Sequence, residues 1–342
     1  MLLASIKPSD MQQYNPNHPI RMRHKRRIPF LLILFFNIGL QLLSAQKLPE
    51  EWFLSTGDWE NGPRLFVKTI GTGPEKVILL HGGWGGEHRS LIRATEGLRK
   101  SYTFILYDQR GSLRSPFPDS LITLPHHIED LELLRKELRL EKLTLVGHSM
   151  GTFLASAYHQ HYPDRVKKLI LLAPVRLKNP VVEVDQPLFE ESNAQFQGFL
   201  KRPEVEMELG KYRLTRPDSL LNSMEKTAKF RINMASRFLY DVTKWVRLTG
   251  GRPFYNPKVY QLTESTNSME SWDFPQNFLA SGIPITAIIG DHDFLDMGAH
   301  ITSKFLADIP NVELVVLEKA GHELWLDQPK AFRKAFKKGL VK

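Results

Sequence analysis

The clearest indication of the fold of this chain is the stretch Leu143-Thr144-Leu145-Val146-Gly147-His148-Ser149-Met150-Gly151-Thr152. Its first four residues predict a buried strand, and Thr152 to Tyr158 predict a helix. Between strand and helix, Ser149 lies on a sharp turn, with a glycine two positions before it and another two positions after it. These glycines let the chain pack closely around a strained serine, which is the geometry of a nucleophile elbow.

The alternative is a strand–helix junction with an incidental serine, because five residues of pattern also occur by chance. The strand before the turn and the helix after it favour the catalytic interpretation. We therefore expect the Ser149 hydroxyl to project from the carboxyl end of a sheet.

Short apolar runs alternate with helical segments over most of the chain. The runs predict strands, and amphipathic or helix-forming stretches between them predict helices. Continuously apolar strands are typical of a parallel sheet that is covered on both faces. The chain is thus predicted to be α/β, with a mostly parallel sheet and helices on both faces. The predicted strands are 64–68, 77–80, 102–107, 143–146, 166–172, 285–289 and 312–317, and the predicted helices are 90–99, 126–140, 152–158, 299–305 and 330–338.

This alternation breaks between about residues 176 and 279, where the sequence is polar, aromatic and rich in proline. Segments 219–231 and 235–248 in it are helix-like. An insertion of this length between two strands does not fit inside the sheet. We expect a helical cap, or lid, at 176–279 over the carboxyl ends of the strands, with residues 46–175 and 280–342 forming the core.

The first 45 residues have the order of a secretory signal peptide: a basic cluster at 21–27, an apolar run from Ile28, and small residues ending at Ala45. Met22 then serves as an alternative start, with residues 1–21 as an upstream extension. A membrane anchor is the other interpretation, but it needs about 20 apolar residues, and the apolar stretch here is shorter and interrupted. The sequence predicts a secreted or periplasmic protein without a stable membrane span after cleavage.

The net charge limits the classes of partner that the chain can bind, and the absence of cysteine limits how an exported form can be stabilised. With six basic residues and one acidic residue in the leader, the formal net charge falls from +9 for the whole chain to +4 for the mature chain. This excess is too small to indicate a nucleic-acid-binding protein. Cysteine is absent, so an exported form would depend on its hydrophobic core rather than on disulfides.

A serine hydroxyl needs a base, and the base needs a group that orients it. The loop Ala320-Gly321-His322 follows the last predicted strand and supplies the imidazole. The turn Gly290-Asp291-His292-Asp293 follows the strand before it, and Asp291, Asp293 and Asp296 compete for the role of the acid. The order Ser, Asp, His along the chain is the one expected when an elbow precedes both partners.

Two backbone N–H groups should stabilise a developing oxyanion. One is that of Met150, directly after the serine. The other is expected from the glycine-rich loop His81-Gly82-Gly83-Trp84-Gly85-Gly86, with Gly83 as the donor. His81 and His148 are interpreted as structural.

The motifs H-G-G-W-G-G, Asp108-Gln109-Arg110-Gly111-Ser112-Leu113-Arg114-Ser115, G-H-S-M-G, G-D-H-D and A-G-H together resemble the α/β-hydrolase superfamily, and the first two resemble its proline iminopeptidase branch. The resemblance covers the chain from about Arg64 to its end, except the cap. It implies Asp293 as the acid, a helical cap, an acyl-enzyme, and neither a cofactor nor a metal. Three departures, Trp84, Leu113 and the elbow His148-Ser149-Met150, weaken the assignment to the branch.

The expected function is therefore a serine hydrolase acting on a small-molecule or short-peptide amide or ester, with Ser149, Asp293 and His322 as the triad. The resemblance implies an aminopeptidase, whose cap carboxylates would hold a free amine; Glu190, Glu191, Glu204 and Glu206 are available for this. A carboxylesterase or lipase-like hydrolase is the alternative. A ligand-binding homologue that has lost turnover is a third interpretation.

Overall fold

The computed structural model describes residues 48–57, 62–179, 185–248, 256–265 and 271–341. Every element discussed below belongs to one compact unit, Pro49–Lys342. The signal-peptide prediction for residues 1–45 lies outside the described residues.

An eight-stranded sheet forms the centre of this unit, in the order β1-β2-β4-β3-β5-β6-β9-β10. β2 pairs antiparallel with β1 and with β4, and all other neighbours are parallel. The mostly parallel sheet predicted from the apolar runs is thus confirmed. The strands are β1 (Glu51–Ser55), β2 (Arg64–Gly71), β3 (Glu75–Leu80), β4 (Tyr102–Tyr107), β5 (Leu143–His148), β6 (Val166–Leu172), β9 (Ile285–Gly290) and β10 (Val312–Leu317).

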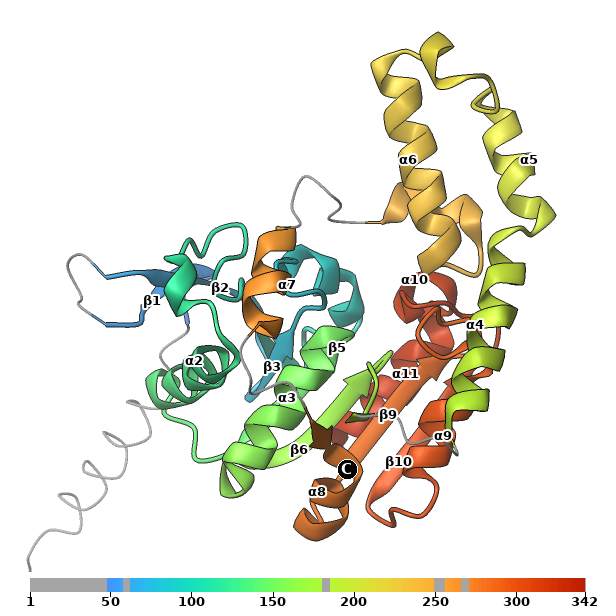
Figure 1. Cartoon of the computed structure of the whole chain (residues 1–342). Coiled ribbons are helices and arrows are strands. Elements are labelled where there is room, and N and C mark those ends of the chain that lie inside the picture. Colours follow the sequence, from blue (N-terminus) through green and yellow to red (C-terminus); the bar gives the residue numbers. More distant parts are fainter. Residues whose placement is uncertain (1–47, 58–61, 180–184, 249–255, 266–270, 342) are drawn as a thin grey trace, which may run out of the picture. The chain divides into compact units, whose positions relative to one another are not determined.

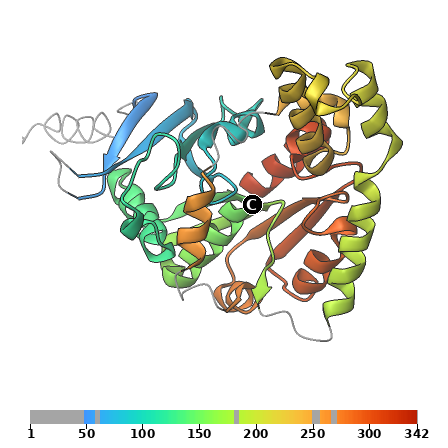
Figure 2. The ribbon, with the colours of Figure 1, turned by 45° about the horizontal axis from the view of Figure 1, so that its top comes forward.

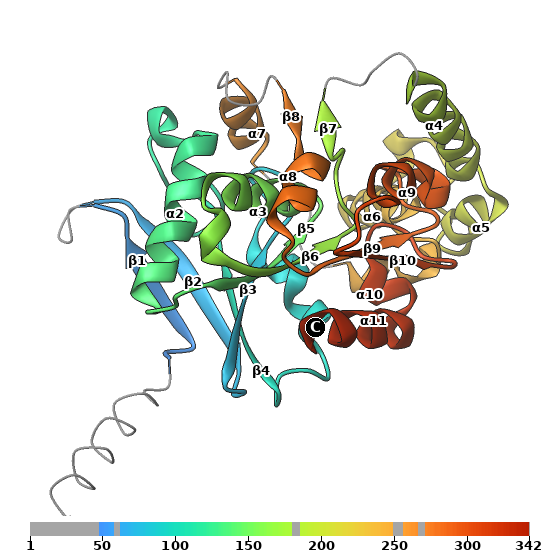
Figure 3. The same cartoon turned by 90° about the horizontal axis from the view of Figure 1, so that it is seen from below.

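Helices cover both faces of the sheet, as Figure 3 shows. On one face, the Phe153 ring of α3 packs against the Phe274 ring of α8 with centroids 5.1 Å apart. On the other face, Phe336 of α11 stacks on Phe104 of β4 at 6.3 Å. The elements outside the insertion are η1 (His88–Thr95), η2 (Asp119–Leu121), α2 (Leu124–Glu137), α3 (Met150–His161), η3 (Pro163–Arg165), η9 (Met297–Ala299), α9 (His300–Leu306), α10 (Leu324–Asp327) and α11 (Pro329–Val341).

The segment between β6 and β9 is mainly helical in its described parts and meets the carboxyl ends of the strands at two places (Figures 1 and 2). Asn256, just before α7, donates its N–H to the carbonyl of Gly85 after β3 (2.8 Å). Glu323, after β10, donates its N–H to the carbonyl of Phe238 at the end of α6 (3.2 Å). The elements are β7 (Lys178–Asn179), α4 (Gln186–Leu200), α5 (Pro203–Lys211), η5 (Asp218–Leu220), α6 (Ser223–Phe238), η6 (Val242–Arg247), α7 (Pro257–Glu264), β8 (Trp272–Asp273) and α8 (Phe274–Ser281).

Some local predictions were wrong. The helix expected over 235–248 does not exist as one element: α6 ends at Phe238, because the Asp327 carboxylate accepts the N–H groups of Tyr240 and Asp241. The predicted helix at 90–99 is a 3₁₀ helix that begins at His88. β1 was not predicted. No helix within the described ranges is both long and apolar enough to cross a membrane.

Candidate active site

The elbow has the local structure that its sequence predicts. β5 ends at His148, Ser149 has φ 53° and ψ −126°, and α3 begins at Met150. This backbone conformation is strained for a residue with a side chain. A Cβ at Gly147 would collide with the carbonyl of Gly151, and a Cβ at Gly151 would collide with that of Leu80. Both glycines are therefore required by close backbone approach.

His322 is joined to one of the three competing acids. Its Nδ1 lies 3.1 Å from Oδ1 and 3.0 Å from Oδ2 of Asp293, and both side chains are buried. Burial disfavours the imidazolium, but the carboxylate of Asp293 and its hydrogen bond outweigh this effect, so the pKa of His322 is raised. An imidazole held in this way is suited to accept and then release a proton.

The other two acids have different partners. Asp291 Oδ1 lies 2.6 Å from Nδ1 of His292 and also accepts the N–H of Ala320. Asp296 accepts the N–H groups of Ile301 and Thr302 and so caps α9. Among the described residues, the geometry favours Asp293 as the acid that orients His322.

The structure brings His322 to the elbow through His148. Nε2 of His148 lies 3.1 Å from the carbonyl oxygen of His322, and the two rings are 4.6 Å apart. Nε2 of His148 therefore donates, and burial together with the nearby His322 holds its pKa well below the ordinary value. No hydrogen bond joins the Ser149 hydroxyl to His322 within the described part of the chain. The pairing of Ser149 with His322 thus remains a prediction.

The glycine-rich loop lies directly against the elbow. A Cβ on Gly82 would be 2.6 Å from the Cβ of Ser149. The next residue, Gly83, has φ +57°, and its carbonyl accepts the N–H of Gly86 (2.7 Å). Met150 is the first residue of α3, so its N–H has no acceptor within the helix. Gly83 and Met150 remain the predicted oxyanion donors.

Buried hydrogen bonds hold this loop from behind. His81 Nε2 accepts the N–H of Gln109 (3.1 Å), and the Gln109 side-chain amide donates to the carbonyl of His81 (3.0 Å). Trp84 is fully buried and stacks on His127 of α2 at 4.8 Å. The tryptophan that departs from the family pattern is therefore part of the core.

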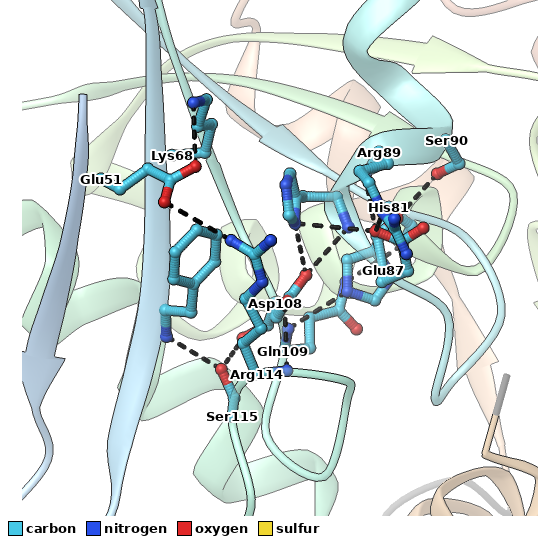
Figure 4. A network of polar contacts seen from close by, with 12 residues as sticks. Glu51, Lys68, His81, Glu87, Arg89, Ser90, Asp108, Gln109, Arg114 and Ser115 are labelled. Carbon is cyan, nitrogen blue, oxygen red and sulfur yellow. Dashed lines mark hydrogen bonds and ion pairs between the residues drawn. The ribbon is translucent and has the colours of Figure 1, made fainter. Parts of the chain in front are cut away.

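Figure 4 shows the polar network that continues behind the loop. Asp108 accepts the N–H and the Nδ1–H of His88 at 3.0 and 2.7 Å, and the N–H of Arg114 at 3.2 Å. Glu87, His88 and Asp108 could supply three atoms to a metal ion. Their donor set does not fit one, because the His88 imidazole already bonds Asp108 and the Arg89 guanidinium bonds Glu87 (3.0 Å). The network is a buried hydrogen-bonded cluster beside the loop.

Aromatic side chains surround His322. The rings of Phe294 and Phe238 lie 4.7 and 5.7 Å from its ring, and Phe238 belongs to α6 of the insertion. The Phe294 ring also contacts Phe238 at 5.3 Å. These two rings form an apolar wall beside the imidazole.

Sequence reasoning missed Asp327. Its carboxylate accepts the N–H groups of Gly321 (2.8 Å), Tyr240 (2.7 Å) and Asp241 (3.1 Å). One buried side chain thus holds both the loop of His322 and the corner that follows α6. The only signal was an acid at the end of the apolar run Leu324-Trp325-Leu326, which indicates a buried carboxylate but not its partners.

The four acidic residues considered for a substrate amine, Glu190, Glu191, Glu204 and Glu206, are all exposed. Glu190 and Glu191 accept hydrogen bonds from glutamines of their own helix. Their positions are typical of a solvated helix surface.

Comparison with known proteins agrees with the fold. Residues 76–329 match the family model described as alpha/beta hydrolase fold. The proline iminopeptidase of Saccharolobus solfataricus is 25% identical over 264 residues, which cover 74% of this chain and 81% of that protein. The structure of the proline iminopeptidase of Mycobacterium smegmatis is similar with a TM-score of 0.57 and 18% identity, over 85% of this chain and 99% of that one. An esterase from Thermogutta terrifontis has a TM-score of 0.57 and 19% identity, over 86% and 98%.

Proposed function

Because this chain belongs to the alpha/beta hydrolase fold family, we propose that it is a serine hydrolase that cleaves a small amide or ester through an acyl-enzyme. The observation that carries the proposal is the buried pair Asp293–His322, which lies beside the strained elbow that bears Ser149.

In the proposed reaction, Ser149 Oγ attacks the carbonyl carbon while Nε2 of His322 takes its proton. Asp293 holds the Nδ1–H tautomer and stabilises the imidazolium, in agreement with the raised pKa of His322. The N–H groups of Met150 and Gly83 stabilise the oxyanion. The imidazolium then protonates the leaving group, and water releases the acyl group by the same route.

A fluorophosphonate probe tests this proposal. We expect it to label the wild type and not Ser149→Ala or the heat-denatured protein. Absence of labelling in the folded wild type would favour the third interpretation, a ligand-binding homologue that has lost turnover.

Proline iminopeptidases among the relatives favour an aminopeptidase acting on short peptides. A carboxylesterase is the second candidate, since the apolar wall of Phe238 and Phe294 also suits an acyl chain. A parallel screen of p-nitrophenyl acyl esters and aminoacyl-naphthylamides, including the prolyl one, separates the two. Activity on esters alone would exclude the aminopeptidase.

We also propose that the protein is exported, on the basis of its leader sequence. Cleavage near Ala45 would give a secreted or periplasmic enzyme, and an uncleaved leader would give a membrane-anchored one. The first residue of the protein recovered from the native host, read by mass spectrometry, distinguishes the two. A first residue near Gln46 supports cleavage, and one at Met1 or Met22 contradicts it.

A further inference from the structure

Glu323 directly follows His322 in the chain, and its carboxylate makes no hydrogen bond or ion pair with any described residue. Its backbone N–H donates to the carbonyl of Phe238 at 3.2 Å. The residue therefore lies where the loop of His322 meets the end of α6. It is half-buried, so its carboxylate is partly removed from water without a partner.

Other acids in the interior of the unit all have partners. Asp327 and Asp296 accept backbone N–H groups. Glu208 accepts hydrogen bonds from Lys211 and Trp245, and Glu132 accepts them from Arg135 and Tyr158. A carboxylate that is half-buried without such bonds loses part of its hydration and gains no partner among the described residues in return, which suggests that the partner of Glu323 comes from outside the chain.

The charges around Glu323 favour a cation. Burial raises its pKa to about 7; the imidazole of His322 acts against this, and Asp327 and Asp293 act with it. None of the groups that act on it is a lysine or an arginine. Asp293 and Glu323 thus both act on the imidazole of His322, and Asp327 acts on Glu323, which gives a negative potential beside this imidazole.

The aromatic rings beside His322 also favour a cation. Phe238 and Phe294 flank His322, and the faces of aromatic rings attract ammonium groups as well as apolar ones. A carboxylate next to such rings is a suitable site for an organic amine.

We propose that Glu323 binds a positively charged amino group of the substrate, next to the carbonyl that Ser149 attacks. This rests on the proposed hydrolase function and narrows its substrates to amides or esters that carry a free amine. The amine is then held by the loop of the core that bears His322, and not by the four exposed acids of the cap.

The test compares Glu323→Gln with the wild type on pairs of aminoacyl-naphthylamides, each with a free or an N-acetylated amine. The substitution keeps the shape of the side chain and removes its charge. We expect kcat/KM for the free-amine substrates to fall about tenfold or more, the order expected for loss of a charged partner. The ratio of kcat/KM for free-amine substrates to that for N-acetylated substrates should fall by the same factor, with both enzymes assayed at a pH above the His322 midpoint so that the change in its pKa does not contribute. Glu204→Gln, at an exposed acid of α5, is the matched control and should change neither.

A second measurement does not need turnover. L-prolinamide should slow fluorophosphonate labelling of the wild type more than N-acetyl-L-prolinamide does, and Glu323→Gln should abolish this difference. Equal effects of the two amides on the wild type, or an unchanged difference in the variant, would overturn the inference while the hydrolase proposal stands. If Ser149 is not labelled at all, the proposed function fails. Calorimetric binding of L-prolinamide then decides the inference alone: binding that is lost in Glu323→Gln supports it, and no binding overturns it.

Discussion

At the scale of single residues, the site depends on which of several similar groups meets His322. Three aspartates follow β9 closely, and spacing alone left all three open. The structure distinguishes them by their partners, since Asp293 bonds the imidazole while Asp291 bonds His292 and Asp296 caps α9. The partner of each aspartate depends on how the turn folds in three dimensions, so the spacing of the three residues in the sequence does not predict it.

We expect Asp293→Asn to lower kcat/KM by about 10⁴-fold, because an amide in this place stabilises the wrong tautomer of the base. Asp291→Asn, which removes a charge in the same turn, should retain activity within about tenfold. Steady-state kinetics on whichever substrate the screen identifies measure both. A larger loss in Asp291→Asn than in Asp293→Asn would reverse the assignment.

The pH dependence follows from the raised pKa of His322. A raised pKa keeps the imidazole protonated, and hence unable to act as a base, up to a higher pH. The rate of fluorophosphonate labelling should therefore rise with pH through a midpoint above the ordinary histidine value of about 6.5. Glu323→Gln removes a charge that helps to raise this pKa, so its midpoint should move to lower pH. A midpoint that stays fixed or rises would contradict this.

At the scale of elements, the strands of the core could be predicted from the sequence, whereas the ends of the helices in the insertion could not. β9 begins where its apolar run begins, because a strand buried on both faces leaves a clear pattern. β10 is an edge strand and only partly buried, but its apolar run also begins where the strand begins. The break after α6 was missed because it depends on Asp327, which is 87 residues away from Tyr240. The pattern of neighbouring residues does not show that a helix ends where a side chain distant in the sequence accepts its backbone N–H groups.

The substitution Asp327→Asn tests whether this carboxylate holds the loop of His322 and the corner after α6 together. The amide offers one acceptor oxygen where the carboxylate offers two, so at least one of the N–H groups of Gly321, Tyr240 and Asp241 loses its partner. We expect the free energy of unfolding to fall by about 1–3 kcal/mol, with a fall in kcat as the loop of His322 loosens. Urea denaturation and kinetics measure the two effects.

The control is Asp218→Asn, whose carboxylate is largely exposed on the cap. It should leave both quantities unchanged. If Asp327→Asn behaves like this control, the carboxylate does not hold the loop and the corner together.

At the scale of the whole described unit, the inserted segment contacts the site from two directions. The end of α6 meets the loop of His322. α7 meets the glycine-rich loop, where Thr263 bonds the His127 ring that stacks on Trp84. The alternating pattern predicted that an insertion would lie over the strands, but these contacts join residues more than 80 positions apart and have no local signature.

Thr263→Val tests the second contact. Thr263 Oγ1 donates to the carbonyl of Val259, so it accepts from Nε2–H of His127 (3.3 Å), and valine would leave that buried donor without a partner. We expect a loss of about 1–3 kcal/mol in the free energy of unfolding. Thr263→Ser, which keeps the hydroxyl, should restore most of it. Equal losses in both variants would point to packing of the methyl group instead.

We propose that Ser149, His322 and Asp293 act together as one catalytic triad at the carboxyl ends of the strands. A crystal structure of the phosphonylated protein tests it most directly. We expect phosphorus bonded to Ser149 Oγ and the imidazole of His322 within hydrogen-bond reach of that oxygen. We also expect the phosphonyl oxygen about 3 Å from the N–H groups of Met150 and Gly83. An adduct on another residue, or an imidazole that stays out of reach of Ser149, would contradict it.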